Sequence, residues 1–119
     1  MSANFWAVPD DLLATCPLVI DRPCGSAHPR HPELIYPLDY GYLEGTSAGD
    51  GHGIDVWLGS EAERHLNAII CTADLDKRDA EIKLLLGCTK ADISAIEAFL
   101  DTPGRFGNVV LSRKRASHA

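Results

Sequence analysis

The chain has 119 residues, of which 17 are Asp or Glu and 11 are Lys or Arg, so its formal net charge is −6. This length suits a single domain, and a hydrophobic fraction of 45 % is ordinary for a globular protein. Three of the basic residues lie in the last seven positions, so residues 1–112 carry 8 basic and 17 acidic residues, a net charge of −9. An acidic body argues against sequence-independent binding of nucleic acid, which needs a basic surface.

The sequence also argues against a membrane or secreted protein. No apolar run approaches the roughly 20 residues of a membrane span, and residues 1–9 lack the features of a signal peptide. The cysteines form no Cys-x-x-Cys pair, which argues against a zinc site of that type. We therefore expect a cytoplasmic protein without membrane contact and with four reduced thiols, at Cys16, Cys24, Cys71 and Cys88.

The first half of the chain reads as a lead-in, one strand and two loops. Residues 1–15 are mixed, with a helical turn over 10–13, and residues 17–21 are typical of a short strand. Four prolines between positions 23 and 37 predict an extended loop, because proline cannot donate to a strand ladder. Residues 36–53 are rich in Gly and Asp and are also expected to form a loop.

The second half predicts strands over 54–58, 66–72 and 82–88, with a charged turn over 73–81. Thr89 and Asp92 suggest a capping box, and apolar residues at helical spacing follow up to the Thr102-Pro103-Gly104 stop. A last strand is expected over 106–111. The order predicts a mainly β (α+β) domain with a helix packed on it, rather than an alternating βα fold.

The densest chemical signal is the segment 36–55, which has carboxylates at Asp39, Glu44, Asp50 and Asp55 and no basic residue. Asp50 and Asp55 bracket a Gly-rich turn that can aim both at one point. Mg²⁺ prefers such oxygen ligands, usually one or two carboxylates with water and phosphate oxygens. The alternative is that Asp and Gly are simply good turn residues.

A second signal is the spacing D-x4-E-x-K of Asp76, Glu81 and Lys83. Glu81 and Lys83 lie two apart on an expected strand and so share a face, where they could hold a metal and an anion together. The alternative is a solvated turn with a weak ion pair. Trp57, beside Asp55, is interpreted as a core residue. Arg30, framed by His28 and His31, is either part of an anion-facing cluster or a solvated loop position.

Together these motifs resemble the signature of soluble family I inorganic pyrophosphatases. Residues 36–46 (YPLDYGYLEGT) match Y-P-x-D/N-Y-G-[FY]-[IL]-x-G-T, and residues 50–56 (DGHGIDV) resemble D-G-D-P-[LIV]-D-V. Asp76, Glu81 and Lys83 match the later D-x4-D-x-K motif in order and spacing, and residues 18–23 resemble the early acidic strand that ends in Pro. The likeness covers residues 16–112, between the lead-in of 1–15 and a basic tail of 113–119.

The resemblance implies a small five-stranded β-barrel of the oligonucleotide-binding type with one or two helices against it. It implies Mg²⁺-dependent hydrolysis of pyrophosphate to two phosphates, with Mn²⁺ as another usable ion, a small phosphate substrate and a homo-oligomer. The implied metal ligands are Asp50, Asp55, Asp76 and Glu81, with Asp21 as an outer acidic residue. Lys83 and Tyr40 would contact phosphate, and Tyr36 would line the site.

The chain departs from the family at several positions. His52 replaces an acidic residue that acts on the attacking water, and it could serve as a base because a neutral imidazole accepts a proton near pH 7. The family's Lys-x-Glu hairpin is missing, and Arg30, two positions from the family's phosphate-site arginine, could stand in for it as a substrate-binding residue. Thr102-Pro103 replaces a Tyr-Lys pair, with Arg105 the nearest cation. Two hypotheses remain open: a hydrolase of pyrophosphate or of another small phosphoanhydride, or a protein that binds metal, phosphate or a partner without turnover.

Overall fold

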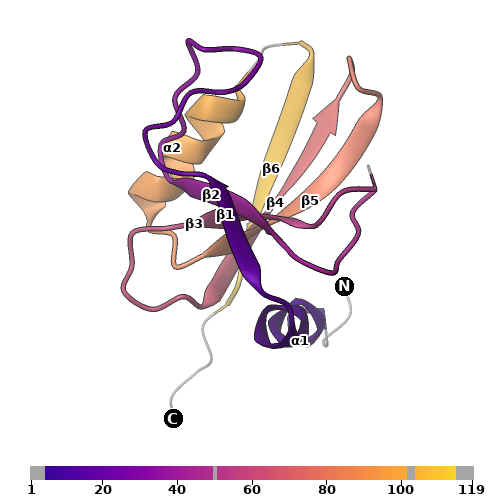
Figure 1. Ribbon diagram of the computed structural model, residues 1–119, viewed down its shortest axis with the longest axis vertical. Coiled ribbons are helices and arrows are strands. Elements are labelled where there is room, and N and C mark those ends of the chain that lie inside the picture. The colour runs from indigo at the N-terminus through magenta and orange to yellow at the C-terminus, as the bar shows by residue number, and fades with distance from the viewer. Residues whose placement is uncertain (1–4, 50, 102–103, 115–119) are drawn as a thin grey trace.

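The computed structural model describes residues 5–49, 51–101 and 104–114. Two helices and six strands make up an α+β fold, which confirms the predicted fold class (Figure 1). In chain order they are α1 (Ala7–Thr15), β1 (Leu18–Arg22), β2 (Asp39–Leu43), β3 (Asp55–Leu58), β4 (Leu66–Asp74), β5 (Asp79–Leu86), α2 (Lys90–Leu100) and β6 (Phe106–Ser112). Within the described residues, neither helix has the length and hydropathy that a membrane crossing requires.

All six strands join one mixed sheet in the order β1-β2-β3-β5-β4-β6. Neighbouring strands are antiparallel except β3 and β5, which run parallel. The prediction of a closed, five-stranded barrel is wrong on two points. The sheet has a sixth strand, and it is open in the described part of the chain, because β1 and β6 form its opposite edges.

Strand β2 is the sixth strand, and it lies in the segment that was expected to be a loop. Glycine is generally depleted in strands, so the sequence of this segment does not predict a strand. Here Gly41 is required by the pairing itself, since a Cβ at this position would lie 1.8 Å from the Val19 carbonyl oxygen in β1. The contact between two backbones, rather than local preference, therefore decides the structure of this segment.

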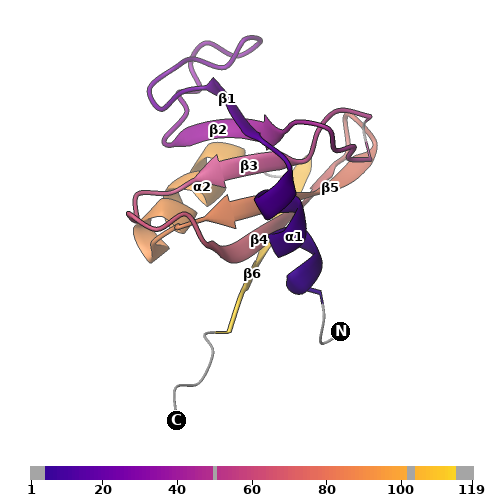
Figure 2. The ribbon, with the colours of Figure 1, turned by 60° about the horizontal axis from the view of Figure 1, so that its bottom comes forward.

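The two helices cover opposite faces of the sheet (Figure 2). Helix α2 packs its buried Ile96 against the face that carries Trp57, Ile70 and Leu85. Trp57 is fully buried there, which confirms its interpretation as a core residue. Helix α1 packs on the other face, against a second cluster of buried residues that comprises Leu43, Val56, Leu66, Ile69, Leu84 and Leu86.

Helix α2 begins with the predicted capping box. The Asp92 backbone N–H donates to Thr89 Oγ1 at 3.0 Å, and the Thr89 N–H donates to Asp92 Oδ2 at 2.9 Å. The same oxygen accepts from the backbone N–H and the hydroxyl of Ser60, at 2.9 and 2.8 Å. Burial opposes ionisation of this carboxyl, but the hydrogen bonds from Ser60 and Thr89 outweigh it and lower the pKa of Asp92.

The β4–β5 hairpin extends further than the sequence predicts. Asp74 and Asp79 still pair as strand residues, so the turn is confined to residues 75–78. The Asp74 side chain stabilises this turn by accepting from the backbone N–H groups of Asp76 and Lys77, at 2.9 and 3.2 Å. Charged residues that were expected to form a turn therefore continue both strands toward the site described next.

The two ends of the described chain are tied together. Arg113, the first residue of the expected basic tail, donates from both Nη atoms to the Asp10 carboxylate at 2.9 Å. Its guanidinium also lies 5.5 Å from the ring centre of Trp6. These contacts hold the end of β6 against α1, which comes from the lead-in segment.

Candidate active site

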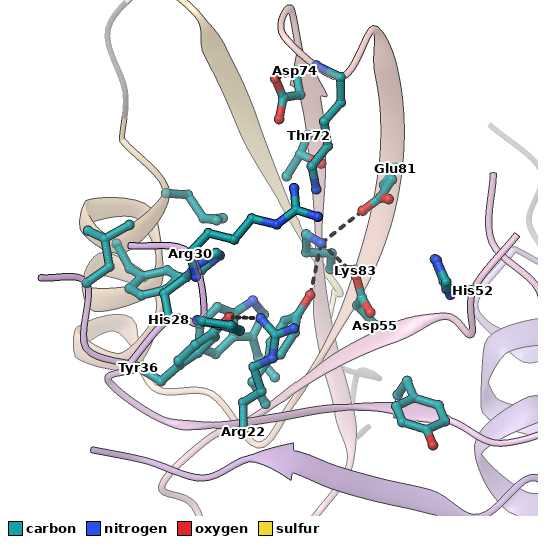
Figure 3. A pocket seen from close by; sticks show the side chains of 18 of the residues that line it. Arg22, His28, Arg30, Tyr36, His52, Asp55, Thr72, Asp74, Glu81 and Lys83 are labelled. Carbon is teal, nitrogen blue, oxygen red and sulfur yellow. Dashed lines mark hydrogen bonds and ion pairs between the residues drawn. The ribbon is translucent and has the colours of Figure 1, made fainter. Parts of the chain in front are cut away.

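A cleft of about 840 Å³ opens on the face of the sheet that carries α2 (Figure 3). Its floor comes from β2, β3 and β5, one wall comes from the proline-rich loop and the end of β1, and another wall comes from the β4–β5 hairpin. The lining residues used below are Asp21, Arg22, His28, Arg30, Tyr36, Tyr40, His52, Asp55, Thr72, Asp74, Lys77, Asp79, Glu81 and Lys83.

The floor of the cleft holds a buried lysine with three oxygen partners. Lys83 Nζ donates to Asp55 Oδ2 at 2.8 Å, to Glu81 Oε2 at 3.0 Å and to the Tyr40 hydroxyl at 3.1 Å (Figure 3). Only 7 % of Lys83 is exposed to solvent. A buried ammonium persists only when it is paired and hydrogen-bonded, and all three of its N–H bonds have an acceptor here.

Strand register explains how these residues meet although they are far apart in the sequence. The parallel pairing of β3 with β5 sets Val56 opposite Leu84, which brings the preceding pair, Asp55 and Lys83, side by side. Glu81 and Lys83 point to one face because strand side chains alternate, as the sequence predicts. Tyr40 arrives through the antiparallel pairing of β2 with β3.

The electrostatics of the cluster keep Lys83 charged. Burial alone disfavours the ammonium, but the Tyr40 oxygen and the Asp55 carboxylate outweigh it, so the pKa of Lys83 is raised. Burial raises the pKa of the Tyr40 phenol, which therefore remains a neutral hydroxyl near neutral pH. The floor thus presents a fixed positive charge between two carboxylates.

The loop side of the cleft is basic. His28 and Arg30 come from the loop where the sequence allowed an anion-facing cluster, whereas Arg22 was not predicted as a site residue. Arg22 Nη1 donates to the buried Tyr36 hydroxyl at 2.6 Å. In Figure 3 the side chains of Arg22, His28 and Arg30 extend into the cleft from the side opposite Lys83. Within the described residues, neither arginine forms an ion pair with a carboxylate.

The pKa of His28 reflects how close these cations are to one another. Burial lowers the pKa of His28, and the positive charges of Arg22, His31, Lys77 and Arg30 lower it further. The basic cluster therefore combines residues from the end of β1, the proline-rich loop and the β4–β5 turn. No local motif could reveal Arg22, because it joins the loop residues only through the fold.

The hairpin side adds Thr72, Asp74 and Asp79, which the sequence analysis also missed. They share a face with Glu81 and Lys83 because Thr72 pairs with Glu81 and Asp74 pairs with Asp79. The alternation of side chains along β5 places Asp79 on the same face as Glu81 and Lys83. The sequence did not predict this because residues 73–81 were expected to form a turn. Thr72 is buried, whereas Asp74 and Asp79 are half-buried.

The structure brings some of the predicted residues together and separates one. Asp21 and His52 line the same cleft as Asp55 and Glu81. Asp76 does not line it, because it lies exposed in the hairpin turn and pairs with Arg105. Asp50 lies outside the described residues.

The donors that converge in the cleft define what kind of metal site is possible. Asp55 and Glu81 each place an oxygen within 3.0 Å of Lys83 Nζ, so the two carboxylates are neighbours on the cleft floor. Among the described residues, which do not include Asp50, no three His, Cys, Asp or Glu side chains form a metal-binding group. These donors fit Mg²⁺ bound through one or two carboxylates and a substrate phosphate, rather than a closed protein cage.

Comparison with known proteins supports the fold of the chain and no more than the fold. No family model and no curated protein match the sequence. Solved structures that match include an inorganic pyrophosphatase from Coxiella burnetii, with 16% identity over 80% of this chain and 82% of that one and a TM-score of 0.56. An inorganic phosphatase from Anaplasma phagocytophilum and an inorganic pyrophosphatase from Helicobacter pylori match with 15% identity, 80% and 81% coverage and the same TM-score. The predicted resemblance is therefore confirmed as a pyrophosphatase-like fold.

Proposed function

We propose that this protein hydrolyses inorganic pyrophosphate to two phosphates in a Mg²⁺-dependent reaction, in the cytoplasm. The observation that carries the proposal is the charged Lys83, fixed between Asp55 and Glu81 on the cleft floor and facing Arg22 and Arg30, neither of which forms an ion pair with a described carboxylate. A small molecule with an anion at each end suits positive groups on both sides of a cleft that also holds carboxylates for a cation.

In this proposal the chain's cations bind the substrate. When Asp55 and Glu81 bind Mg²⁺, the N–H bonds that Lys83 gives to them would become available, so Lys83 and the Tyr40 hydroxyl would donate to one phosphoryl group. Arg22 and Arg30 would donate to the other. Arginine suits this role because its planar guanidinium donates two parallel hydrogen bonds to phosphate. Tyr36 acts through Arg22, since its hydroxyl accepts the Nη1 hydrogen bond and holds that guanidinium toward the cleft.

Asp55, Glu81 and Asp50 would hold Mg²⁺, with Asp21 as an outer acidic residue. A bound Mg²⁺ offsets negative charge on the substrate and makes a coordinated water more acidic. His52 lines the cleft and is proposed to accept a proton from the attacking water. Asp76 shares the family spacing, but its place in the exposed turn leaves it the least supported of the proposed ligands.

A phosphate-release assay with pyrophosphate and Mg²⁺ tests the proposal. We expect release that stops on addition of EDTA, and loss of release in Asp55→Asn. Asp11→Asn is the matched control, because Asp11 is an exposed carboxylate on α1, away from the cleft. Release from wild type no greater than from Asp55→Asn between pH 6 and 9 would exclude hydrolysis. Tripolyphosphate and nucleoside diphosphates in the same assay separate pyrophosphate from other phosphoanhydrides.

A second candidate is binding of phosphate or metal without turnover. It is favoured by His52 in the place of an acidic residue and by the described residues' lack of a three-ligand metal group. Calorimetric titration with phosphate in Mg²⁺ buffer distinguishes the two: binding without phosphate release supports this candidate. Activity that appears only in His52→Asp would show that the natural chain lacks the base.

A further inference from the structure

The imidazole ring of His28, in the proline-rich loop, is held from two sides. The backbone N–H of Arg30 donates to His28 Nδ1 at 3.1 Å. Pro29 lies between them and has no N–H of its own, so the N–H of Arg30 is the next one that can turn back to the ring. The ring also lies parallel to that of the buried Tyr36, with an interplanar angle of 4° and 6.2 Å between the ring centres. These two contacts fix the orientation of the imidazole.

The hydrogen bond from Arg30 decides which nitrogen of the His28 ring carries the proton. A backbone N–H can only donate, so Nδ1 must be the acceptor and must be without a proton. The neutral ring then carries its proton on Nε2, on the edge that faces away from the Arg30 backbone. His28 lines the cleft, and Figure 3 shows its side chain extending into it. The cleft wall therefore presents an uncharged N–H donor, which has no hydrogen-bond partner among the described residues.

The surroundings of His28 favour the neutral ring. Burial lowers its pKa most, and positive groups from three elements lower it further: Arg22 at the end of β1, Arg30 and His31 in the loop, and Lys77 in the β4–β5 turn. The carboxylate of Glu33 in the same loop lies 3.8 Å from the Nδ1 atom of His31 instead. The α2 residues that line the cleft, Phe99 and Leu100, are uncharged. Protonation would also turn Nδ1 into a donor and break its hydrogen bond from the Arg30 backbone.

We propose that His28 is a substrate-binding residue that donates from Nε2, as a neutral imidazole, to the phosphoryl group bound by Arg22 and Arg30. The inference rests on the proposed function, because it takes the cleft to bind a phosphoanhydride. A third cation beside two arginines would add repulsion to the cleft before the anion binds, whereas a neutral donor adds a hydrogen bond without that repulsion. Since the donor carries no charge, its contribution to binding should stay constant between pH 7 and 9.

Equilibrium binding of imidodiphosphate in Mg²⁺ buffer at pH 8 tests the proposal without turnover, because a P–N–P bridge replaces the anhydride. His28→Phe keeps a ring that can lie on Tyr36 but loses the donor, and it should raise the dissociation constant about tenfold or more. His28→Gln restores a neutral N–H donor and should bring the constant back to within about threefold of wild type. His65→Phe is the matched control and should change nothing, because His65 is an exposed histidine beside Glu61 and does not line the cleft.

The pH dependence separates a neutral donor from an imidazolium. The ratio of the dissociation constants of His28→Phe and wild type should be the same at pH 7, 8 and 9. An imidazolium would lose its proton as the pH rises, and the ratio would then fall toward one. Nitrogen NMR gives a second readout. The His28 signals, identified by their absence in His28→Phe, should show a proton on Nε2 and none on Nδ1 at pH 8, with and without imidodiphosphate.

The outcomes distinguish this inference from the proposed hydrolysis. Equal binding by wild type and His28→Phe, a ratio that falls with pH, or a proton on Nδ1 would each overturn the role of His28 and leave the hydrolysis standing. Binding that depends on His28 and is restored by His28→Gln, in a chain that releases no phosphate from pyrophosphate, would support the role of His28 and overturn the hydrolysis. A wild-type chain that does not bind imidodiphosphate would overturn both.

Discussion

On one face of strands β4 and β5 lie Thr72, Glu81 and Lys83, and on the other lie Cys71 and Ile82, although these residues alternate along the same two backbones. Their exposure is the reverse of what their chemistry would suggest. The ammonium-bearing Lys83 is 7 % exposed, whereas the aliphatic Ile82 beside it is 46 % exposed. Charged residues are almost never fully buried unless paired, and large aliphatic residues are among those most often buried.

Each half of this reversal has its own physical meaning. On the cleft face, three oxygen acceptors compensate the burial of Lys83, so the buried side chain stays charged. On the opposite face, Ile82 and Val109 are exposed within the described part of the chain, so their apolar area meets solvent there. Alternation along a strand therefore assigns each residue to a face of the sheet, whereas the surrounding elements decide whether that face is buried or exposed.

The largest effect is expected from removing the buried charge. Lys83→Met leaves Asp55 and Glu81 facing one another without their shared cation, so the free energy of unfolding should fall by about 3–5 kcal/mol and phosphate release should be lost. Urea denaturation and the phosphate-release assay measure the two effects. Lys90→Met, at the exposed start of α2, is the matched control and should change neither.

The pH dependence of the Lys83 effect has a definite sign. Because the folded state raises the pKa of Lys83, the stabilisation is fully present below the unfolded-state value of about 10.4 and is lost as the pH rises through the higher folded-state value. The stability difference between wild type and Lys83→Met should therefore be constant from pH 6 to 9 and shrink only in strong alkali. A difference that changes near neutral pH would contradict this account.

A pair of neighbouring substitutions tests the two faces against each other. Glu81→Gln should lower phosphate release by about 10–100-fold, since it alters the metal-binding side of the cleft. Ile82→Ser should leave phosphate release unchanged, because Ile82 is exposed on the opposite face of the sheet. Phosphate-release assays on both variants measure the contrast. Equal effects of both variants on release would mean that the two faces are not independent.

A smaller effect is expected from a buried carboxylate that lies on neither face. Asp92→Asn weakens the cap of α2 and the link to Ser60, which should lower the free energy of unfolding by about 1–2 kcal/mol without changing phosphate release. Because the pKa of Asp92 is lowered on folding, this stabilisation is fully present above the unfolded-state pKa of about 3.9 and is lost as the pH falls through the lower folded-state pKa. Denaturation at pH 7 and pH 3 measures the difference in stability between wild type and Asp92→Asn, which should be smaller at the lower pH.

The smallest effect is expected at the tip of the hairpin. Asp76 and Arg105 form an exposed ion pair, so Asp76→Asn should leave the unfolding transition unchanged within error. Its phosphate release should also remain close to wild type, in contrast to Glu81→Gln. A loss of release as large as that of Glu81→Gln would show that Asp76 acts in the site after all and that the turn must rearrange.

Much of the local structure could be predicted because it depends on short-range rules. Thr89 and Asp92 lie three residues apart and form the capping box that begins α2. Glu81 and Lys83 lie two residues apart and therefore share a strand face. The burial of Trp57 followed from its size and its apolar strand. Strand β2 and the short hairpin turn were not predicted, because both depend on contacts between distant segments. Gly41 and Asp74 read locally as turn residues, and only pairing with distant strands shows that they belong to the sheet.

The sequence by itself determined which groups are available: paired carboxylates, the D-x4-E-x-K spacing and a helix with its own cap. The tertiary structure alone decided which of them meet. It brings Asp55 to Lys83 through a parallel strand pair, adds Arg22 from the end of β1, and leaves Asp76 on an exposed turn. The physical reason is the sequence range over which each interaction acts. Backbone geometry and capping act over a few residues, whereas strand register joins segments that are far apart in the sequence.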